Sequence, residues 1–134
     1  MPSRSTVESF VALVEAGDYV GAIEQFYVAD ASTRENNGAP RVGRDTLIAM
    51  ERGVMMAHRK IEARRLAPAL IEGDNVAIAW RFEFTTPEDA TRTLEEIAWQ
   101  TWRGEQLVEE RFFYDPRQMA ATTAPAQPEA VAVS

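Results

Sequence analysis

The sequence of 134 residues contains no cysteine and a single histidine, His58. The lack of cysteine excludes disulfides, thiol nucleophiles and thiolate metal ligands. One histidine among scattered glutamates gives no metal-binding pattern, so no metal is expected. His58 is expected to close a helix, where the helix dipole favours a cation, and this structural role is preferred to a catalytic one.

Long apolar runs and nucleotide-binding motifs are missing as well. No stretch of about 18 apolar residues is present, so no transmembrane helix is expected. The opening MPSRSTVESF lacks the apolar run of a secretory signal. There is no glycine-rich phosphate loop and no serine nucleophile elbow. These features predict a cytoplasmic protein without a cofactor and without a membrane partner.

Basic charge is scarce, with 14 Lys and Arg against 21 Asp and Glu, a net charge of −7. Nucleic-acid binding needs a basic surface, so a nucleic-acid partner is not expected. The one basic cluster comprises Arg59, Lys60, Arg64 and Arg65. We interpret it as a solvated strand face in preference to an anion site.

The length and the 46% hydrophobic content fit one globular domain. Residues 1–5 are expected to form a short N-terminal arm, and residues 6–118 the domain. Residues 119–134 are rich in Ala and Pro without periodicity, which predicts a disordered tail.

Three helices are predicted from apolar spacing. Ser5 and Glu8 have the spacing of a capping box at the start of the first helix. The inward side chains of the first helix would be Val7, Phe10, Val11 and Val14. Those of the second helix would be Val20, Ile23, Phe26 and Tyr27. A third helix is expected from about Arg44 to Ala57, with mostly inward Leu47, Ile48, Met50, Val54 and Met55.

Strands are predicted at residues 30–36, 59–72, 76–85, 94–102 and 107–115. Pro68 should interrupt the second of them, and Gly73-Asp74-Asn75 has the composition of a hairpin turn. The order of elements indicates an α+β fold in which three N-terminal helices pack in the concave face of a strongly curved antiparallel β-sheet, giving a cone-shaped α+β barrel.

The last three strands divide by parity into two sets of side chains. The aromatic set comprises Ile78, Trp80, Phe82, Phe84, Ile97, Trp99 and Phe113. The mixed set, which has the composition of a lined cavity, comprises Ala77, Ala79, Arg81, Glu83, Leu94, Glu96, Ala98, Gln100, Trp102, Val108, Glu110, Phe112 and Tyr114. Neither set resembles a solvated face, so both faces of the sheet are expected to be covered.

The run FVALVEAGDYVGAIEQFYVADASTRENNGAPRVGRDTLIA resembles the opening of SnoaL-type and ketosteroid isomerase-like proteins of the nuclear transport factor 2-like superfamily. The recurring elements are a helix ending in A-G-D, an F-Y-x-x-D-A step into the first strand, an N-G turn and a G-R-D that opens the third helix. The closing EERFFYDP is similar to the family's last strand, so the resemblance covers roughly residues 6–117.

This resemblance implies a conical pocket between the concave sheet face and the helices, and a homodimer through the convex face. It assigns the dimer contact to Trp80, Phe82, Phe84, Trp99 and Phe113. Without the resemblance, the sequence favours packing of these aromatic side chains against the helices. The two placements are mutually exclusive.

The resemblance to ketosteroid isomerases implies a carboxylate base at Glu35. The two hydrogen-bond donors of their oxyanion hole correspond to Phe10 and Ala98, which cannot donate. Loss of one such donor costs about 2.7–4 kcal/mol of barrier, which argues against steroid-type isomerisation.

The resemblance to limonene-type epoxide hydrolases implies a different catalytic set. Arg81 and Glu83 match the arginine-x-acid spacing on one strand, and Thr33 and Glu35 correspond to the water-holding residues. The second acid is replaced by Phe112, with Glu110 two residues earlier, about 7 Å along the strand.

Glu35, Glu83, Glu96 and Glu110 would then share one cavity with Arg81. Crowded carboxylates cannot all ionise cheaply, so the pKa of at least one should be well above its solution value. The alternative is that Arg81 neutralises Glu83 or Glu110 inside a polar core, and that Glu96 lies near the rim.

The remaining candidate pocket residues also have two interpretations. Met55 could line the cavity or fill the core, and the aromatic side chains of Trp102 and Tyr114 could form cavity walls or ordinary core packing. The full set of candidate pocket residues comprises Phe10, Thr33, Met55, Glu96, Ala98, Gln100, Trp102, Phe112 and Tyr114.

Two functional hypotheses follow. In the first, the protein binds a small, largely apolar molecule and is a cofactor-independent isomerase, hydrolase, cyclase or dehydratase. Glu35 or Glu110 is then the base, Arg81 orients the acids and Glu83 donates a proton. In the second, the same fold is a non-catalytic ligand-binding or dimerisation module.

Overall fold

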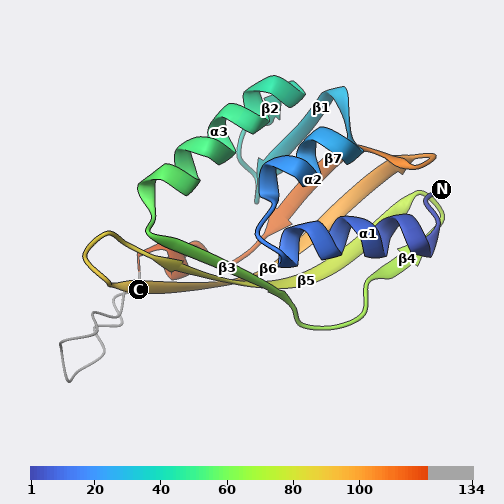
Figure 1. Cartoon of the computed structure of the whole chain (residues 1–134). Helices are drawn as coiled ribbons and strands as arrows, with labels where there is room; N and C mark the ends of the chain where they lie inside the picture. The colour runs from blue at the N-terminus through green and yellow to red at the C-terminus, as the bar shows by residue number, and fades with distance from the viewer. Residues whose placement is uncertain (121–134) are drawn as a thin grey trace.

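A computed structural model of the chain describes residues 1–120 (Figure 1). The predicted tail, residues 119–134, lies outside the described residues apart from its first two. The elements, in chain order, are α1 (Arg4–Glu15), α2 (Tyr19–Phe26), β1 (Tyr27–Glu35), β2 (Arg41–Val42), α3 (Arg44–Ala57), β3 (Lys60–Arg65), β4 (Leu70–Glu72), β5 (Asn75–Thr85), β6 (Thr91–Arg103), β7 (Gln106–Phe113) and the 3₁₀ helix η1 (Pro116–Met119).

The strands form one sheet in the order β2-β1-β7-β6-β5-β3, and β4 pairs with β5 next to β3. The predicted α+β architecture is confirmed, with the three α-helices on one face of the sheet (Figure 1). The sheet is mixed, however, because β1 runs parallel to β7 while the other pairs are antiparallel. We call the face under the helices the inner face and the opposite one the outer face.

The first helix buries the predicted apolar stripe, Val7, Phe10, Val11 and Val14. Its N-cap is Ser3 and not Ser5, since the Ser3 side chain accepts a hydrogen bond from the Thr6 backbone N–H at 3.1 Å. Glu8 is unavailable for the predicted capping box because it pairs with Arg65 at 2.6 Å. That ion pair fastens the first helix to β3.

The predicted long strand is broken as expected around Pro68, giving β3 and β4. Gly73, with a φ of +58°, makes the hairpin turn between β4 and β5, a conformation that favours glycine. Among residues 1–120, no helix has both the length and the apolar character required to cross a membrane.

The register between β5 and β6 decides which side chains face the helices. Trp80 is opposite Glu96, and Arg81 is opposite Glu95. Residues directly opposite in an antiparallel pair point to the same side of the sheet. Trp80 and Ile78 are buried, so Glu96 shares the inner face with them, whereas Arg81 lies on the outer face with Glu95.

The predicted set that groups Trp80 with Trp99 on one face is therefore wrong, because the register between β5 and β6 differs by one residue from the predicted one. Trp80, Phe82 and Phe84 lie on the inner face, which removes them from the predicted dimer contact. Trp99 and Phe113 do lie on the outer face, where they are 48% and 42% exposed. A slip of one residue in pairing moves every side chain of a strand to the other face, which explains the error.

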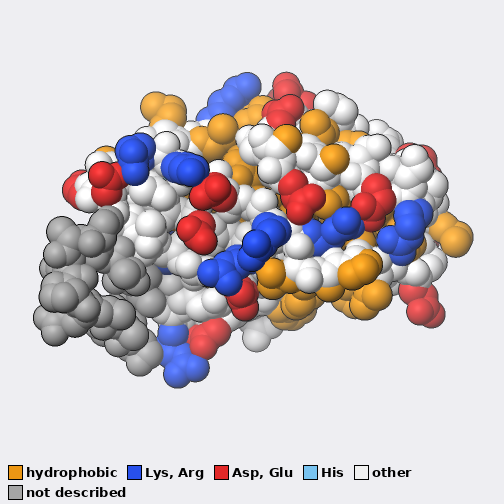
Figure 2. Space-filling model, turned by 60° about the horizontal axis from the view of Figure 1, so that its bottom comes forward, with side chains coloured by type: hydrophobic (Ala, Val, Ile, Leu, Met, Phe, Trp, Pro, Cys, Tyr) orange, Lys and Arg blue, Asp and Glu red, His pale blue; other side chains and the backbone are white. Residues whose placement is uncertain are grey.

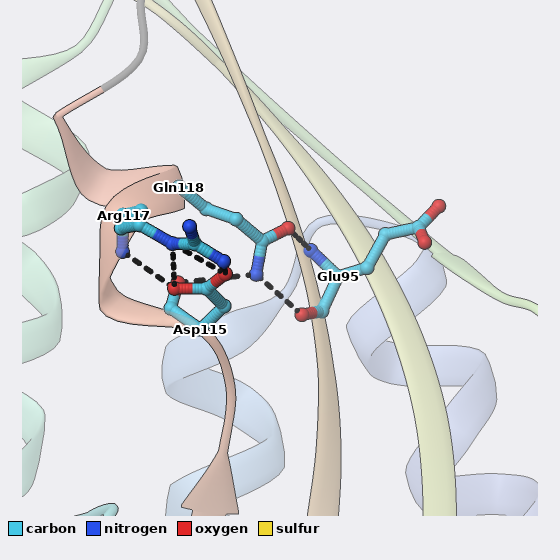
Figure 3. Close-up of polar contacts among 4 residues, drawn as sticks. All are labelled: Glu95, Asp115, Arg117 and Gln118. Atoms are coloured by element: carbon cyan, nitrogen blue, oxygen red, sulfur yellow. Dashed lines mark hydrogen bonds and ion pairs between the residues drawn. The ribbon is translucent and has the colours of Figure 1, made fainter. Parts of the chain in front are cut away.

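The segment that follows β7 is held against β6 by η1 (Figure 3). The β6–β7 pairing stops at Ile97 and Phe113. Beyond that point the Gln118 side chain accepts from the Glu95 backbone N–H at 2.9 Å and donates to the Glu95 carbonyl at 3.0 Å. A side-chain amide thus satisfies backbone groups that β7 no longer reaches, and η1 closes one side of the sheet.

Candidate functional site

A cavity of about 380 Å³ lies between the helices and the inner face of the sheet. This volume is in the range of small-molecule sites. Its walls include several aromatic side chains, among them Phe10, Tyr19, Trp80, Phe82, Phe84 and Phe112. Four glutamates, Glu35, Glu51, Glu96 and Glu110, and the arginines Arg41 and Arg92 supply its charged groups.

The floor of the cavity contains a buried hydrogen-bond chain that ends at Glu110. Trp102 Nε1 donates to Gln100 Oε1 at 2.9 Å, and Gln100 Nε2 donates to Glu110 Oε2 at 2.7 Å. Tyr27 Oη donates to the other carboxyl oxygen of Glu110. Burial raises the pKa of Glu110, although the hydrogen bonds from Gln100 and Tyr27 oppose this, and burial raises the pKa of Tyr27 well above its usual value.

Glu35, at the end of β1, lies in a different environment. Arg41 Nη2 donates to Glu35 Oε2 at 2.6 Å, and Tyr114 Oη donates to Glu35 Oε1. Burial by itself raises the pKa of Glu35, but the hydrogen bonds from Tyr114 and Arg41 and the charge of Arg41 outweigh it, so the pKa is lowered. Glu35 is consequently ionised at neutral pH.

The environment of Glu96 raises its pKa, in contrast to that of Glu35. No hydrogen bond to its carboxyl group comes from the described part of the chain, and the side chain faces the cavity beside Trp80. Burial, followed by the negative charges of Glu110, Glu35 and Glu51, raises the pKa of Glu96 to about 8. Glu96 is therefore mostly protonated at neutral pH and able to donate a hydrogen bond.

Glu51 brings a fourth carboxyl group into the cavity from α3. Burial raises its pKa too.

Nothing in residues 1–120 gathers three His, Asp or Glu side chains in a way that could ligate a metal. The group is thus an array of carboxyls with different protonation preferences, which suits proton transfer.

The predicted catalytic residues separate into two groups. Glu35 and Glu110 line the cavity. The placement of Arg81 and Glu83 in the cavity is wrong, because both side chains lie on the outer face. There Arg81 is 3.5 Å from Glu95 and 4.0 Å from Glu83, and the three side chains are between 37% and 51% exposed.

Five of the predicted pocket residues, Phe10, Thr33, Glu96, Phe112 and Tyr114, line the cavity. Ala98, Gln100 and Trp102 are on the inner face but are fully buried, so they belong to the core beneath it. Met55 does not line the cavity, so its predicted placement is wrong; from α3 it is Met50 and Val54 that reach the cavity wall.

Sequence reasoning missed several cavity residues. The sequence predicts Tyr27 in the apolar stripe of the second helix, yet it opens β1, its ring lies 6.4 Å from that of Phe10 between centroids, and its hydroxyl donates to Glu110. Arg41 follows a turn and Arg92 begins a strand, positions that carry no periodic signal. His58 caps α3 as expected and also lines the cavity, against Phe84.

The fold and the cavity together define an α+β pocket protein of the nuclear transport factor 2-like class. The model of the SnoaL-like domain family matches residues 7–110, and the chain belongs to that family. The resemblance noted in the sequence is confirmed. No curated protein matches the chain.

Solved structures share the fold at low sequence identity. A candidate SnoaL-like polyketide cyclase of Mesorhizobium loti is 22% identical, with a TM-score of 0.69 over 82% of this chain and 97% of its own. A nuclear transport factor 2-like protein of unknown function from Burkholderia pseudomallei K96243 is 15% identical, with a TM-score of 0.74 over 87% and 95%.

A third structure comes from Catenulispora acidiphila DSM 44928 and was solved in complex with trimethylamine. This protein has a ketosteroid isomerase-like fold and is 16% identical, with a TM-score of 0.71 over 84% of this chain and 87% of its own. At such identities the likeness establishes the fold and leaves the activity to be argued from the cavity.

Proposed function

We propose that the protein catalyses cofactor-independent proton transfer on a small, largely apolar molecule that carries a carbonyl group. Glu35 is the base and Glu96 is the acid. The observation that carries this proposal is the pair of carboxyls on one cavity whose environments shift their pKa values in opposite directions. Such divergence is how one site supplies an acid and a base at the same pH.

The Glu35 carboxylate takes a proton from the carbon next to the carbonyl. The electron pair of that C–H bond forms a C=C bond to the carbonyl carbon, and the π electron pair of the C=O bond moves onto the oxygen. The protonated Glu96 donates a hydrogen bond to the resulting enolate oxygen. In a β,γ-unsaturated carbonyl compound, return of the proton from Glu35 to the γ-carbon gives the conjugated isomer, and in any carbonyl compound its return to the same carbon gives exchange.

The aromatic walls support an apolar substrate body, and the ion pair with Arg41 holds Glu35 in one orientation. The family context supports the same class of chemistry, since a relative in fold is designated a candidate polyketide cyclase. Glu96 also supplies a donor in a cavity where Phe10 and Ala98 provide none.

Hydrogen–deuterium exchange tests the proposal without knowledge of the natural substrate. The neutral ketone 2-tetralone is incubated with the protein in D₂O, and loss of the α-proton signal is followed by NMR. Glu35→Gln should slow the enzyme-dependent exchange by about 100-fold, the usual contribution of a general base. Glu96→Gln should slow it by about 10-fold or more, because the amide is a weaker donor to an enolate.

Glu95→Gln is the matched control, since Glu95 is the neighbour of Glu96 and points to the outer face. It should leave the exchange rate within about twofold. Exchange by Glu35→Gln at the unmodified rate would exclude Glu35 as the base, and a rate equal to that of buffer for the unmodified protein would contradict proton transfer on this ketone.

A second candidate function is a non-catalytic binding module. The observation that favours it is the occupation of Glu35 by Arg41 and Tyr114, which uses lone pairs that a base must present to its substrate. Under this alternative, 2-tetralone binds, as seen by perturbed NMR signals of cavity residues, yet its α-protons exchange at the rate of buffer.

We also propose that the outer face is the contact of a homodimer. Ile97, Trp99 and Phe113 are each more than 40% exposed there, and the underside of the molecule shows hydrophobic side chains among both acidic and basic ones (Figure 2). Such clustering is typical of interaction surfaces. Trp99→Glu should convert dimers into monomers in sedimentation velocity, while Glu24→Gln on the exposed side of α2 should not. Dimers that persist in Trp99→Glu would place the contact elsewhere.

A further inference from the structure

Two buried hydrogen-bond donors at the cavity lack an acceptor. They are the Nε atoms of Arg41 and Arg92, and within residues 1–120 they are the buried side-chain nitrogen or oxygen atoms without a partner. Both arginines line the cavity. Buried polar atoms in native proteins are nearly always paired, so each of these two donors requires an acceptor that the side chains and backbone of residues 1–120 do not supply.

One nitrogen of the Arg41 guanidinium already has a hydrogen-bond partner. Arg41 Nη2 donates to Glu35 at 2.6 Å, and this ion pair balances the charge of Glu35, whose pKa is lowered. The Nε–H of the same guanidinium is left to a different oxygen. Arg41 therefore offers a directed hydrogen bond next to the proposed base without offering a free charge.

Arg92 retains its charge. Its Nη1 donates to the Met119 carbonyl at 3.2 Å, and the guanidinium carbon lies 5.4 Å from the centroid of the Phe84 ring. In the described part of the chain no carboxylate lies within ion-pair distance of Arg92, in contrast to Arg41. A guanidinium with five donors, one of them spent on a neutral carbonyl, is suited to a carboxylate.

The glutamates do not cancel this preference. Glu35 is paired with Arg41, and the two carboxyl oxygens of Glu110 already accept hydrogen bonds from Tyr27 and Gln100. Glu96, whose pKa is raised to about 8, is mostly neutral at neutral pH. A positive Arg92 facing this group favours an anion over a cation in the cavity.

We infer that the ligand is an apolar organic acid whose carboxylate pairs with Arg92 and whose ring system packs against the aromatic walls, with a second oxygen accepting from Arg41 Nε. This inference rests on the proposed function in one respect, namely that a small molecule occupies the cavity. It adds the chemical class of that molecule and the residue that recognises its charge.

Three probes of matched shape test the inference by isothermal titration calorimetry at pH 7: 2-naphthoate, the neutral 2-naphthamide and the cation 2-naphthylmethylammonium. Naphthoate should bind about 10-fold more tightly than the amide, because a charge-assisted pair replaces a neutral hydrogen bond. Arg92→Gln should abolish that difference and change the affinity for the amide by no more than about twofold.

Arg103→Gln is the control, since Arg103 is exposed at the other end of β6; it should preserve the preference for naphthoate. Equal binding of naphthoate and the amide, preference for the ammonium compound, or a naphthoate preference that survives in Arg92→Gln would each overturn the inference. Because 2-tetralone carries no charge, its exchange reports proton transfer alone, so the two experiments can fail independently.

Discussion

Replacement of Trp102 with alanine is expected to lower the free energy of unfolding by about 3–5 kcal/mol, the range for removal of a large aromatic side chain from a core. Trp102 is 1% exposed, and its ring meets Phe10 and Phe26 edge-on at 6.0 and 6.2 Å between centroids. The substitution also removes the N–H that Gln100 accepts, leaving a buried amide oxygen unpaired. Urea denaturation monitored by far-UV circular dichroism measures the change.

Two variants separate the causes. Trp102→Phe keeps most of the packing and loses the hydrogen bond, so it should cost about 1–3 kcal/mol. Trp99→Ala, on the outer face and 48% exposed, should cost about 1 kcal/mol or less when measured at low protein concentration, where any dimer is dissociated. A loss for Trp102→Ala no larger than that for Trp99→Ala would show that Trp102 is not a core residue.

The helical half of the fold could be predicted because its signal is local. The stripe Val7, Phe10, Val11 and Val14 has the period of one helix face, and the bounds expected for the third helix are those observed for α3. Pro68 and Gly73 mark the break and the turn between β3, β4 and β5 through backbone constraints that act within a few residues. Parallel pairing of β1 with β7 joins segments far apart in sequence, so no local pattern reports it.

The candidate site could be predicted only where parity within one strand was sufficient. Glu96, Gln100 and Trp102 were correctly placed on one side of β6, as were Glu110 and Phe112 on β7. Relating β5 to β6 required the register across a turn, and β6 carries an aromatic residue at each parity, Trp99 and Trp102. The pairing of Trp80 with Glu96 put Arg81 and Glu83 outside, against the prediction.

The arginines of the cavity show a second limit of the sequence. Arg81 was favoured because its spacing to Glu83 matched a known catalytic pattern, whereas Arg41 and Arg92 had no patterned neighbour. The structure pairs Arg41 with Glu35 through a contact that depends on the Asn36–Pro40 turn and the short β2. Which arginines reach the cavity thus depends on how distant segments of the chain come together in the fold. The spacing of residues along the sequence does not reveal this.

Replacement of Glu96 with glutamine is expected to stabilise the protein at alkaline pH and to have little effect in acid. The pKa of Glu96 is raised from 4.5 to about 8, mainly by burial. The folded protein therefore binds more protons at this site than the unfolded chain between those values, and the contribution of Glu96 to stability falls as the pH rises through that window. Below pH 4.5 both states are protonated, and a neutral amide of the same shape changes little.

The full difference in the free energy of unfolding between Glu96→Gln and the unmodified protein should appear above pH 8, the approximate pKa of Glu96 in the folded state. A shift of this size corresponds to at most about 5 kcal/mol, and because Glu96 is partly exposed we expect about 2–4 kcal/mol of stabilisation at pH 9. Urea denaturation of both proteins at pH 4.5, 7 and 9 gives the difference at each pH, and Glu95→Gln, on the outer face, should give a difference that is nearly independent of pH. If Glu96→Gln stabilises the protein equally at pH 4.5 and 9, Glu96 titrates normally and is ionised at neutral pH, and the hydrogen bond that it is proposed to donate to an enolate could not form.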